Sequence, residues 1–177
     1  MTAPAPATRP LILVAGIGNV FLGDDGFGPA LARRLADEPL PLEVQVADYG
    51  ISGMHLAYDL MAGYPTTILL DAVNRGDPPG TVSVLEVDPG QLAWSEPVEQ
   101  AARYVDGHGM QPDQVLALLR ALGGEPGRVL VVGCEPVTTE EQLGLSQVVT
   151  EAVEQAVPVV KELVGRELAR LRQEAAA

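Results

Sequence analysis

The sequence predicts an α/β fold built around an open, mostly parallel β-sheet, and three observations support this prediction. Short, unbroken apolar runs such as residues 11–15 have the length and branching of strands that are buried on both faces. These runs alternate with stretches in which apolar residues recur at helical spacing. Several of them end in aspartate near glycine, at the position where open α/β sheets bind their ligands.

The first half of the chain alternates strands and helices. After the strand at residues 11–15, a glycine-rich loop leads to a helix whose apolar face is formed by Phe27, Leu31 and Leu35. Residues 42–47 alternate between apolar and polar types, which predicts a strand with one wetter face. A short helix over residues 54–61 follows, capped near Ser52.

The second half supplies three more strands and two helices. Residues 66–70 and 128–133 are apolar and β-branched, as in buried strands. The link between residues 71 and 81 is too short to hold a crossover helix, so strand 81–87 should pair antiparallel. Helices are predicted to begin at Pro112, which suits a first turn, and near Ser146.

The chain has 177 residues, of which 47% are hydrophobic, enough for one well-buried domain but few for two. We expect a single catalytic domain over residues 10–173, a disordered leader over residues 1–9 and a frayed tail over residues 174–177. No apolar run is long enough to span a bilayer, and no signal-peptide cleavage site follows Arg9. A lone cysteine suits a reducing compartment, so we expect a cytoplasmic protein. We also expect the protein to be a monomer.

The formal net charge of −13 narrows the classes of partner. Nucleic acids and anionic membranes both require basic surface, so neither is expected to bind. The acidity itself is typical of a surface that keeps a protein in solution.

Two adjacent carboxylates, Asp24 and Asp25, lie in the first glycine-rich loop. A dinucleotide-binding turn would need glycine or alanine three residues after Gly18, where Phe21 stands. The two acids would also repel a pyrophosphate at the helix N-terminus. Capping the helix requires only one of them, so the pair indicates a cation site.

Polar residues also follow the other predicted parallel strands. They are Asp48, Asp71 and the pair Cys134 and Glu135. If these strands are parallel, their ends meet at one edge of the sheet. Repulsion between carboxylates opposes their ionisation, and a divalent cation relieves it.

A histidine could complete such a site. His108 lies between two glycines at the end of the long segment 88–109 and can be brought to the strand ends. Two carboxylates and one imidazole suit Zn, Ni, Mn or Fe. His55 lies within a predicted helix and is expected to be an ordinary surface or core residue.

Motifs on several separate loops together resemble the nickel–iron hydrogenase maturation endopeptidases, over roughly residues 11–165. The residues that carry the resemblance are Gly16-Ile17-Gly18-Asn19, Asp24-Asp25-Gly26-Phe27-Gly28, Asp48-Tyr49-Gly50-Ile51-Ser52-Gly53, Leu70-Asp71-Ala72 and Gly107-His108-Gly109. Members of this family remove a C-terminal extension from the hydrogenase large-subunit precursor once nickel has been inserted. The resemblance implies a three-layer α/β/α sandwich around a five-stranded sheet.

The resemblance also implies roles for individual residues. Metal contacts and catalysis fall on Asp25, Asp71 and His108, and a further catalytic role falls on Asp48. Contacts with the substrate are expected at Asp24, Gly50 and Gly53. Nickel would be supplied by the substrate, and Zn or Cd could occupy the site as a surrogate. Some members carry glutamate at the position of Asp25, so the reach of this ligand differs here.

Several alternatives stay open at this point. The metal could serve only to recognise a loaded precursor, or it could also polarise the scissile carbonyl. The protein could be a cysteine hydrolase that uses Cys134 with His108, although no basic residue flanks the cysteine to activate it. It could also be a non-catalytic, nickel-dependent checkpoint or chaperone of the large subunit.

Overall fold

The computed structural model of the chain describes residues 9–88 and 112–177 and contains one five-stranded sheet. The strand order is β2-β1-β3-β5-β4. The strands are β1 (Ile12–Ile17), β2 (Val44–Gly50), β3 (Thr66–Ala72), β4 (Val82–Val87) and β5 (Arg128–Cys134). The edge strand β4 pairs antiparallel with β5, and the other pairings are parallel. This confirms the predicted mixed sheet and its antiparallel strand.

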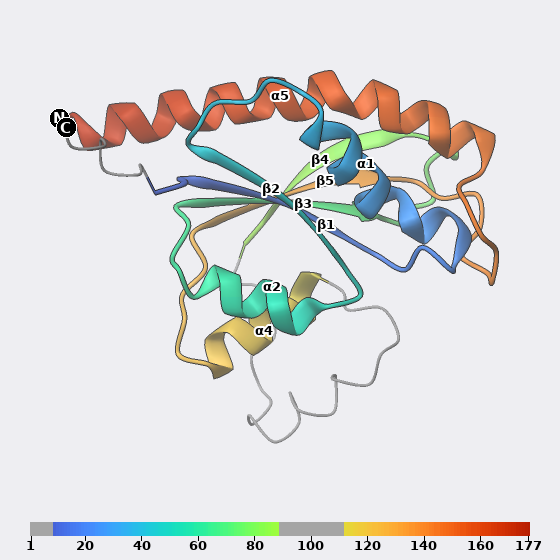
Figure 1. Ribbon diagram of the computed structural model, residues 1–177, viewed down its shortest axis with the longest axis horizontal. Coiled ribbons are helices and arrows are strands. Elements are labelled where there is room, and N and C mark those ends of the chain that lie inside the picture. Colours follow the sequence, from blue (N-terminus) through green and yellow to red (C-terminus); the bar gives the residue numbers. More distant parts are fainter. Residues whose placement is uncertain (1–8, 89–111) are drawn as a thin grey trace, which may run out of the picture.

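Helices cover both faces of the sheet, as Figure 1 shows. The helices are the 3-10 turn η1 (Gly23–Gly26), α1 (Phe27–Ala36), α2 (Gly53–Leu60), α4 (Pro112–Ala121) and α5 (Gln147–Ala175). Helices α1 and α5 pack on one face in an aliphatic cluster that includes Leu31, Leu70 and Val160. Helices α2 and α4 pack on the other face, around Leu56, Leu69 and Leu116. The three-layer sandwich is therefore confirmed.

Alternation along each strand decides which face a side chain meets. On β3, Ile68 and Leu70 face α1 and α5, whereas Leu69 faces α2 and α4. Asp71 continues this alternation and belongs to the α2/α4 face. Strand β2 continues to Gly50, beyond its predicted end at residue 47, so Asp48 lies inside the strand rather than in the loop after it.

The long helix α5 begins at Ser146, whose side chain accepts a hydrogen bond from the backbone nitrogen of Val149. The helix extends to Ala175, two residues into the predicted 174–177 tail. Of the predicted leader, residues 1–8 lie outside the described part of the chain. None of the helices within residues 9–88 and 112–177 is both long and apolar enough to cross a bilayer.

Helix α1 approaches the sheet unusually closely at Gly28. A Cβ atom at this position would clash with the backbone carbonyl oxygens of Leu70 and Ile17. The first turn of α1 therefore rests directly on the carboxyl ends of β3 and β1. This contact places η1, which immediately precedes α1, beside the end of β3.

We predict that Gly28→Ala destabilises the protein by about 1–3 kcal/mol or more, because backbone atoms must shift to admit the methyl group. Urea denaturation measures the effect. The matched control is Gly165→Ala in α5, where a Cβ would meet no heavy atom within 4 Å. This control should be neutral or more stable by up to about 1 kcal/mol. Equal denaturation midpoints for the two variants would contradict the close-packing argument.

Candidate functional site

A cavity of about 1170 Å³ lies at the carboxyl edge of the sheet, on the α2/α4 side. Residues that follow β1 and β3, the first turn of α4 and the segment 136–143 form its described walls. Side chains of β4 and β5 contribute an apolar floor of Leu85, Val87 and Val131. The polar residues that line it are Asn19, Asp25, Asp71, Asn74, Asp113, Thr139, Glu141 and Gln142.

Two of the predicted ligands, Asp25 and Asp71, meet in this cavity. Asp71 is only 6% exposed. Burial raises its pKa well above the usual range, the charge of Asp25 raises it further, and a backbone hydrogen bond from Ala72 opposes the shift. Asp25 is partly buried, and its Oδ2 accepts a hydrogen bond of 2.6 Å from the backbone nitrogen of Asn19. The two carboxyl groups therefore interact electrostatically, as a shared cation site requires.

The pair supplies two of the three predicted metal ligands. Within residues 9–88 and 112–177, no group of three or more His, Cys, Asp or Glu side chains is arranged to hold a metal ion. The third predicted ligand, His108, lies outside the described residues. Carboxylate oxygens fit a divalent cation, and its charge would offset the burial and the repulsion from Asp25 that raise the pKa of Asp71. The carboxylates of Asp25 and Asp71 thus suit a divalent cation that takes its remaining ligands from outside the described residues.

Asp24 has a different environment from its neighbour. Its side chain is fully buried. Its carboxylate accepts hydrogen bonds from the backbone nitrogens of Val137 (2.8 Å), Thr138 (3.4 Å) and Ser146 (2.7 Å), and from the Ser146 hydroxyl (3.0 Å). Asp24 therefore anchors the segment that forms one wall of the cavity. The contact with substrate that the sequence predicted at this residue is not available to so enclosed a carboxylate.

Asp48 lies away from the cavity. It pairs with Gly16 of β1, whose Cα faces α1, and its own carboxylate accepts hydrogen bonds from Arg33 of that helix. Its side chain therefore lies on the opposite face of the sheet from Asp71. The sequence placed the two acids at one site because β2 was expected to end before Asp48.

The two glycines predicted to contact substrate, Gly50 and Gly53, shape the loop after β2. Gly50 has a φ of +53°, donates its N–H to Asp48 Oδ1 (3.0 Å) and accepts from the backbone nitrogen of Gly18 (3.0 Å). Gly53 is the buried first residue of α2. Neither glycine is among the described residues that line the cavity.

Cys134 does not have the environment of a nucleophile. Its side chain is fully buried in the cluster between the sheet and α5. Burial, together with the charges of Asp24 and Glu135, raises the pKa of the thiol to about 11. Since the thiolate is the reactive form, this thiol is inert at neutral pH. The geometry therefore argues against the cysteine-hydrolase alternative.

The segment 136–143 is the part of the site that sequence reasoning missed. It contributes Thr139, Glu141, Gln142 and Leu143 to the cavity, and its backbone pairs with the loop after β1 through the bridge between Leu22 and Gln142. The available signal was its place directly after the last parallel strand. Cavity residues contributed by such loops are expected at this edge of a sheet.

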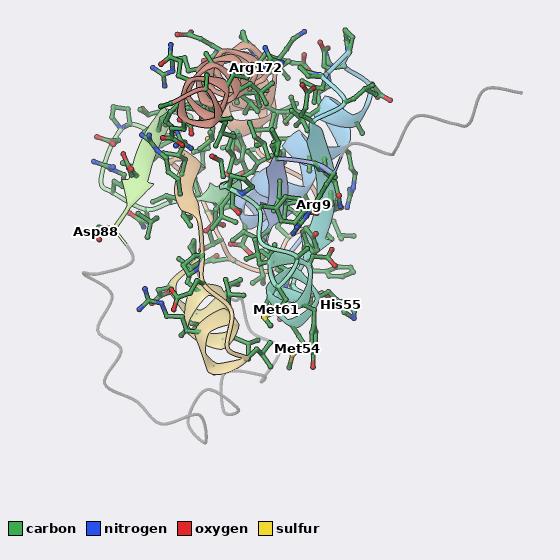
Figure 2. The ribbon with its side chains drawn as sticks, turned by 90° about the vertical axis from the view of Figure 1, so that its left-hand side faces the viewer. Arg9, Met54, His55, Met61, Asp88 and Arg172 are labelled. Atoms are coloured by element: carbon green, nitrogen blue, oxygen red, sulfur yellow. The ribbon has the colours of Figure 1, made fainter. Side chains whose placement is uncertain are left out.

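His55, the other histidine, is exposed on α2. Figure 2 shows its side chain projecting outward from this helix, at the end of the molecule away from Arg172 of α5. It is not among the described residues that line the cavity. The expectation that it is an ordinary surface residue agrees with this position.

Together these features define an α/β protein with a paired-carboxylate cavity at the carboxyl edge of its sheet. The sequence profile of the family described as hydrogenase maturation protease matches residues 28–163. This is well over half of the chain, and the chain therefore belongs to the hydrogenase maturation proteases.

Individual relatives agree with this assignment. The hydrogenase 2 maturation protease of Escherichia coli is 30% identical over 151 residues, which cover 84% of this chain and 87% of that protein. The hydrogenase expression/formation protein HupD of Rhodobacter capsulatus is 33% identical over 78% of this chain, which spans 64% of that relative's length.

Solved structures of the same class share the fold. The hydrogenase maturating endopeptidase HybD from E. coli has 30% sequence identity and a TM-score of 0.66, with 94% of each chain covered. The hydrogenase 2 maturation peptidase from a Thaumarchaeota archaeon has 35% identity and a TM-score of 0.65, covering 89% of this chain and 99% of that one. The predicted family and fold class are confirmed.

We predict that Asp71→Asn is more stable than the wild type at pH 7.5 in the absence of metal. The pKa of Asp71 is higher in the folded protein than in the unfolded chain, so the folded state binds more protons between the two values. The stability that protonated Asp71 contributes is therefore lost as pH rises from about 4 towards the pKa of Asp71 in the folded protein. Urea denaturation from pH 3.5 to 8 should show the variant's advantage disappear at the acidic end. Parallel curves for the two proteins would contradict the burial of this carboxyl.

We predict that iodoacetamide does not label Cys134 in the folded protein at pH 7.5, because the thiol is both enclosed and protonated. Mass spectrometry of the intact chain measures the modification. The same reaction in 6 M guanidinium is the positive control and should label the single cysteine fully. Rapid labelling of the folded chain would contradict the burial of Cys134 and would support the cysteine-hydrolase alternative.

Proposed function

We propose that this chain removes a C-terminal extension from a nickel–iron hydrogenase large-subunit precursor after nickel insertion, and that it recognises the nickel through Asp25, Asp71 and His108. Family membership supports the endopeptidase activity. The observation that carries the recognition step is the pairing of Asp71 with Asp25 in the cavity.

The pairing provides a physical basis for selecting a loaded precursor. Burial and the neighbouring Asp25 keep Asp71 from ionising readily. A divalent ion brought by the substrate would supply the positive charge that allows both carboxylates to bind as anions. A precursor without nickel lacks this charge and would leave the repulsion in place.

The proposed third ligand is His108, by resemblance to the family. Two carboxylate oxygens and an imidazole suit nickel and leave coordination positions for ligands that the precursor provides. Zn or Cd could take the same ligands as a surrogate when nickel is absent. In this proposal nickel belongs to the substrate and is not a resident cofactor.

Two mechanisms remain compatible with this arrangement. In the first, the ligands only recognise nickel that is held by the precursor. In the second, the scissile carbonyl is also polarised by the bound ion. In the first mechanism, Asp48 would help to orient the cleavage segment or serve as an acid or base. For either role the segment must reach the α1 face of the sheet, where the Asp48 carboxylate accepts from Arg33.

We predict that His108→Ala lowers the rate of cleavage of a nickel-loaded precursor by about 100-fold or more, because one of three ligands is lost. Intact-mass spectrometry of the precursor measures the loss of its extension. His55→Ala is the matched control, since it removes the other histidine from an exposed helical position, and it should cut at the wild-type rate.

The same assay separates the proposal from its alternatives. Wild-type cleavage by His108→Ala would refute the role of the histidine. A wild-type protein that binds the nickel-loaded precursor without changing its mass would identify a checkpoint rather than an endopeptidase. Equal cleavage of precursors with and without nickel would refute recognition of the metal.

A further inference from the structure

Asn19 lines the cavity beside Asp25, and the proposed function assigns no role to its side chain. Three of its groups have partners within the chain. Its backbone nitrogen donates to Asp25 Oδ2 at 2.6 Å, and its side-chain Oδ1 accepts from the backbone nitrogen of Phe21 at 3.0 Å. Its carbonyl oxygen accepts from the backbone nitrogen of Leu22.

These contacts define how the side-chain amide is oriented. The N–H of Phe21 can only donate, so it must face the oxygen of the Asn19 carboxamide. The amide nitrogen, Nδ2, therefore points away from Phe21. Among the described residues, no hydrogen-bond partner of Nδ2 is found, and two N–H donors are left for a ligand.

The turn that carries Asn19 is held firmly. Gly18 has a φ of +135°, and a Cβ there would clash with the backbone carbonyl oxygen of Asp25. Its N–H donates to the Gly50 carbonyl at 3.0 Å. A donor held in place before the substrate arrives stabilises developing charge without reorganisation.

During hydrolysis of a peptide bond, negative charge develops on the scissile carbonyl oxygen. The residues that line the cavity limit which side chains could stabilise this oxyanion. The cavity's charged described residues are all acids, namely Asp25, Asp71, Asp113 and Glu141, and no Lys or Arg is among the described residues that line it. The side-chain donors among the described lining residues are therefore neutral. Of the neutral donors on its described walls, Asn74, Thr139 and Gln142 are exposed, whereas Asn19 is partly buried and bonded to Asp25.

We propose that Asn19 is a catalytic residue whose Nδ2 donates a hydrogen bond to the scissile carbonyl oxygen of the peptide. This inference rests on the proposed endopeptidase function. Water adds to the carbonyl carbon, and the carbonyl oxygen takes the electron pair of the π bond. That pair re-forms the C=O bond as the C–N bond breaks, and the leaving amine takes up the proton that the attacking water loses. Asn19 itself neither gains nor loses a proton. The hydrogen bond from its Nδ2 shortens as the scissile carbonyl oxygen becomes negative.

Three substitutions separate this role from that of holding the turn. Asn19→Asp and Asn19→Ser keep a side-chain oxygen that can accept from the Phe21 N–H but lack Nδ2. Asn19→Ala lacks both groups. We predict that all three lower kcat for the nickel-loaded precursor by about 100- to 1000-fold, with KM changed little. Asn19→Ser should bind Cd²⁺ as tightly as the wild type in calorimetry, because Asp25 and Asp71 are intact.

Two results would overturn the assignment. If Asn19 only holds the turn, the Asp and Ser variants will cut at the wild-type kcat and the Ala variant alone will fail. If the amide contacts substrate outside the transition state, KM will rise and kcat will not fall. Either result, obtained while the wild type cuts the precursor, leaves the proposed function standing. A wild type that does not cut the precursor refutes the proposed function itself.

Discussion

The approach of helix α1 to the sheet is the contact on which the site depends. Gly28 lies against the carbonyl oxygens of Ile17 and Leu70, so the first turn of α1 rests on the carboxyl ends of β1 and β3. A close-packed interior cannot admit even one methyl group here without a shift of backbone. The contact holds η1 beside β3, and Asp25 of η1 consequently reaches Asp71.

The geometry of η1 gives two adjacent acids different roles. Successive side chains of a 3-10 helix point about 120° apart. Asp24 turns inward, where its carboxylate accepts four hydrogen bonds from the segment between Val137 and Ser146. Asp25 turns towards the cavity. One turn therefore both fixes a wall of the site and presents a charge to the ligand.

Stability and ligand recognition oppose each other in this cavity. Asp71 is buried beside Asp25, although solvent would hydrate an isolated carboxylate better. A titratable group held with a raised pKa in a cavity is a recognised sign of a functional site. The acids among the described lining residues would repel an oxyanion, which favours a neutral donor such as the proposed amide of Asn19.

The sequence by itself determined the order of the elements, the antiparallel β4 and the position of Asp25 and Asp71 at the carboxyl edge of the sheet. Apolar spacing and link length set these features, and both depend on residues that are neighbours in the chain. The position of His108 stays a prediction. Only the tertiary structure decided that Asp24 faces inward and that Asp48 lies opposite Asp71, on the α1 face. These outcomes depend on where β2 ends and on how segments far apart in sequence pack, and no local pattern encodes either.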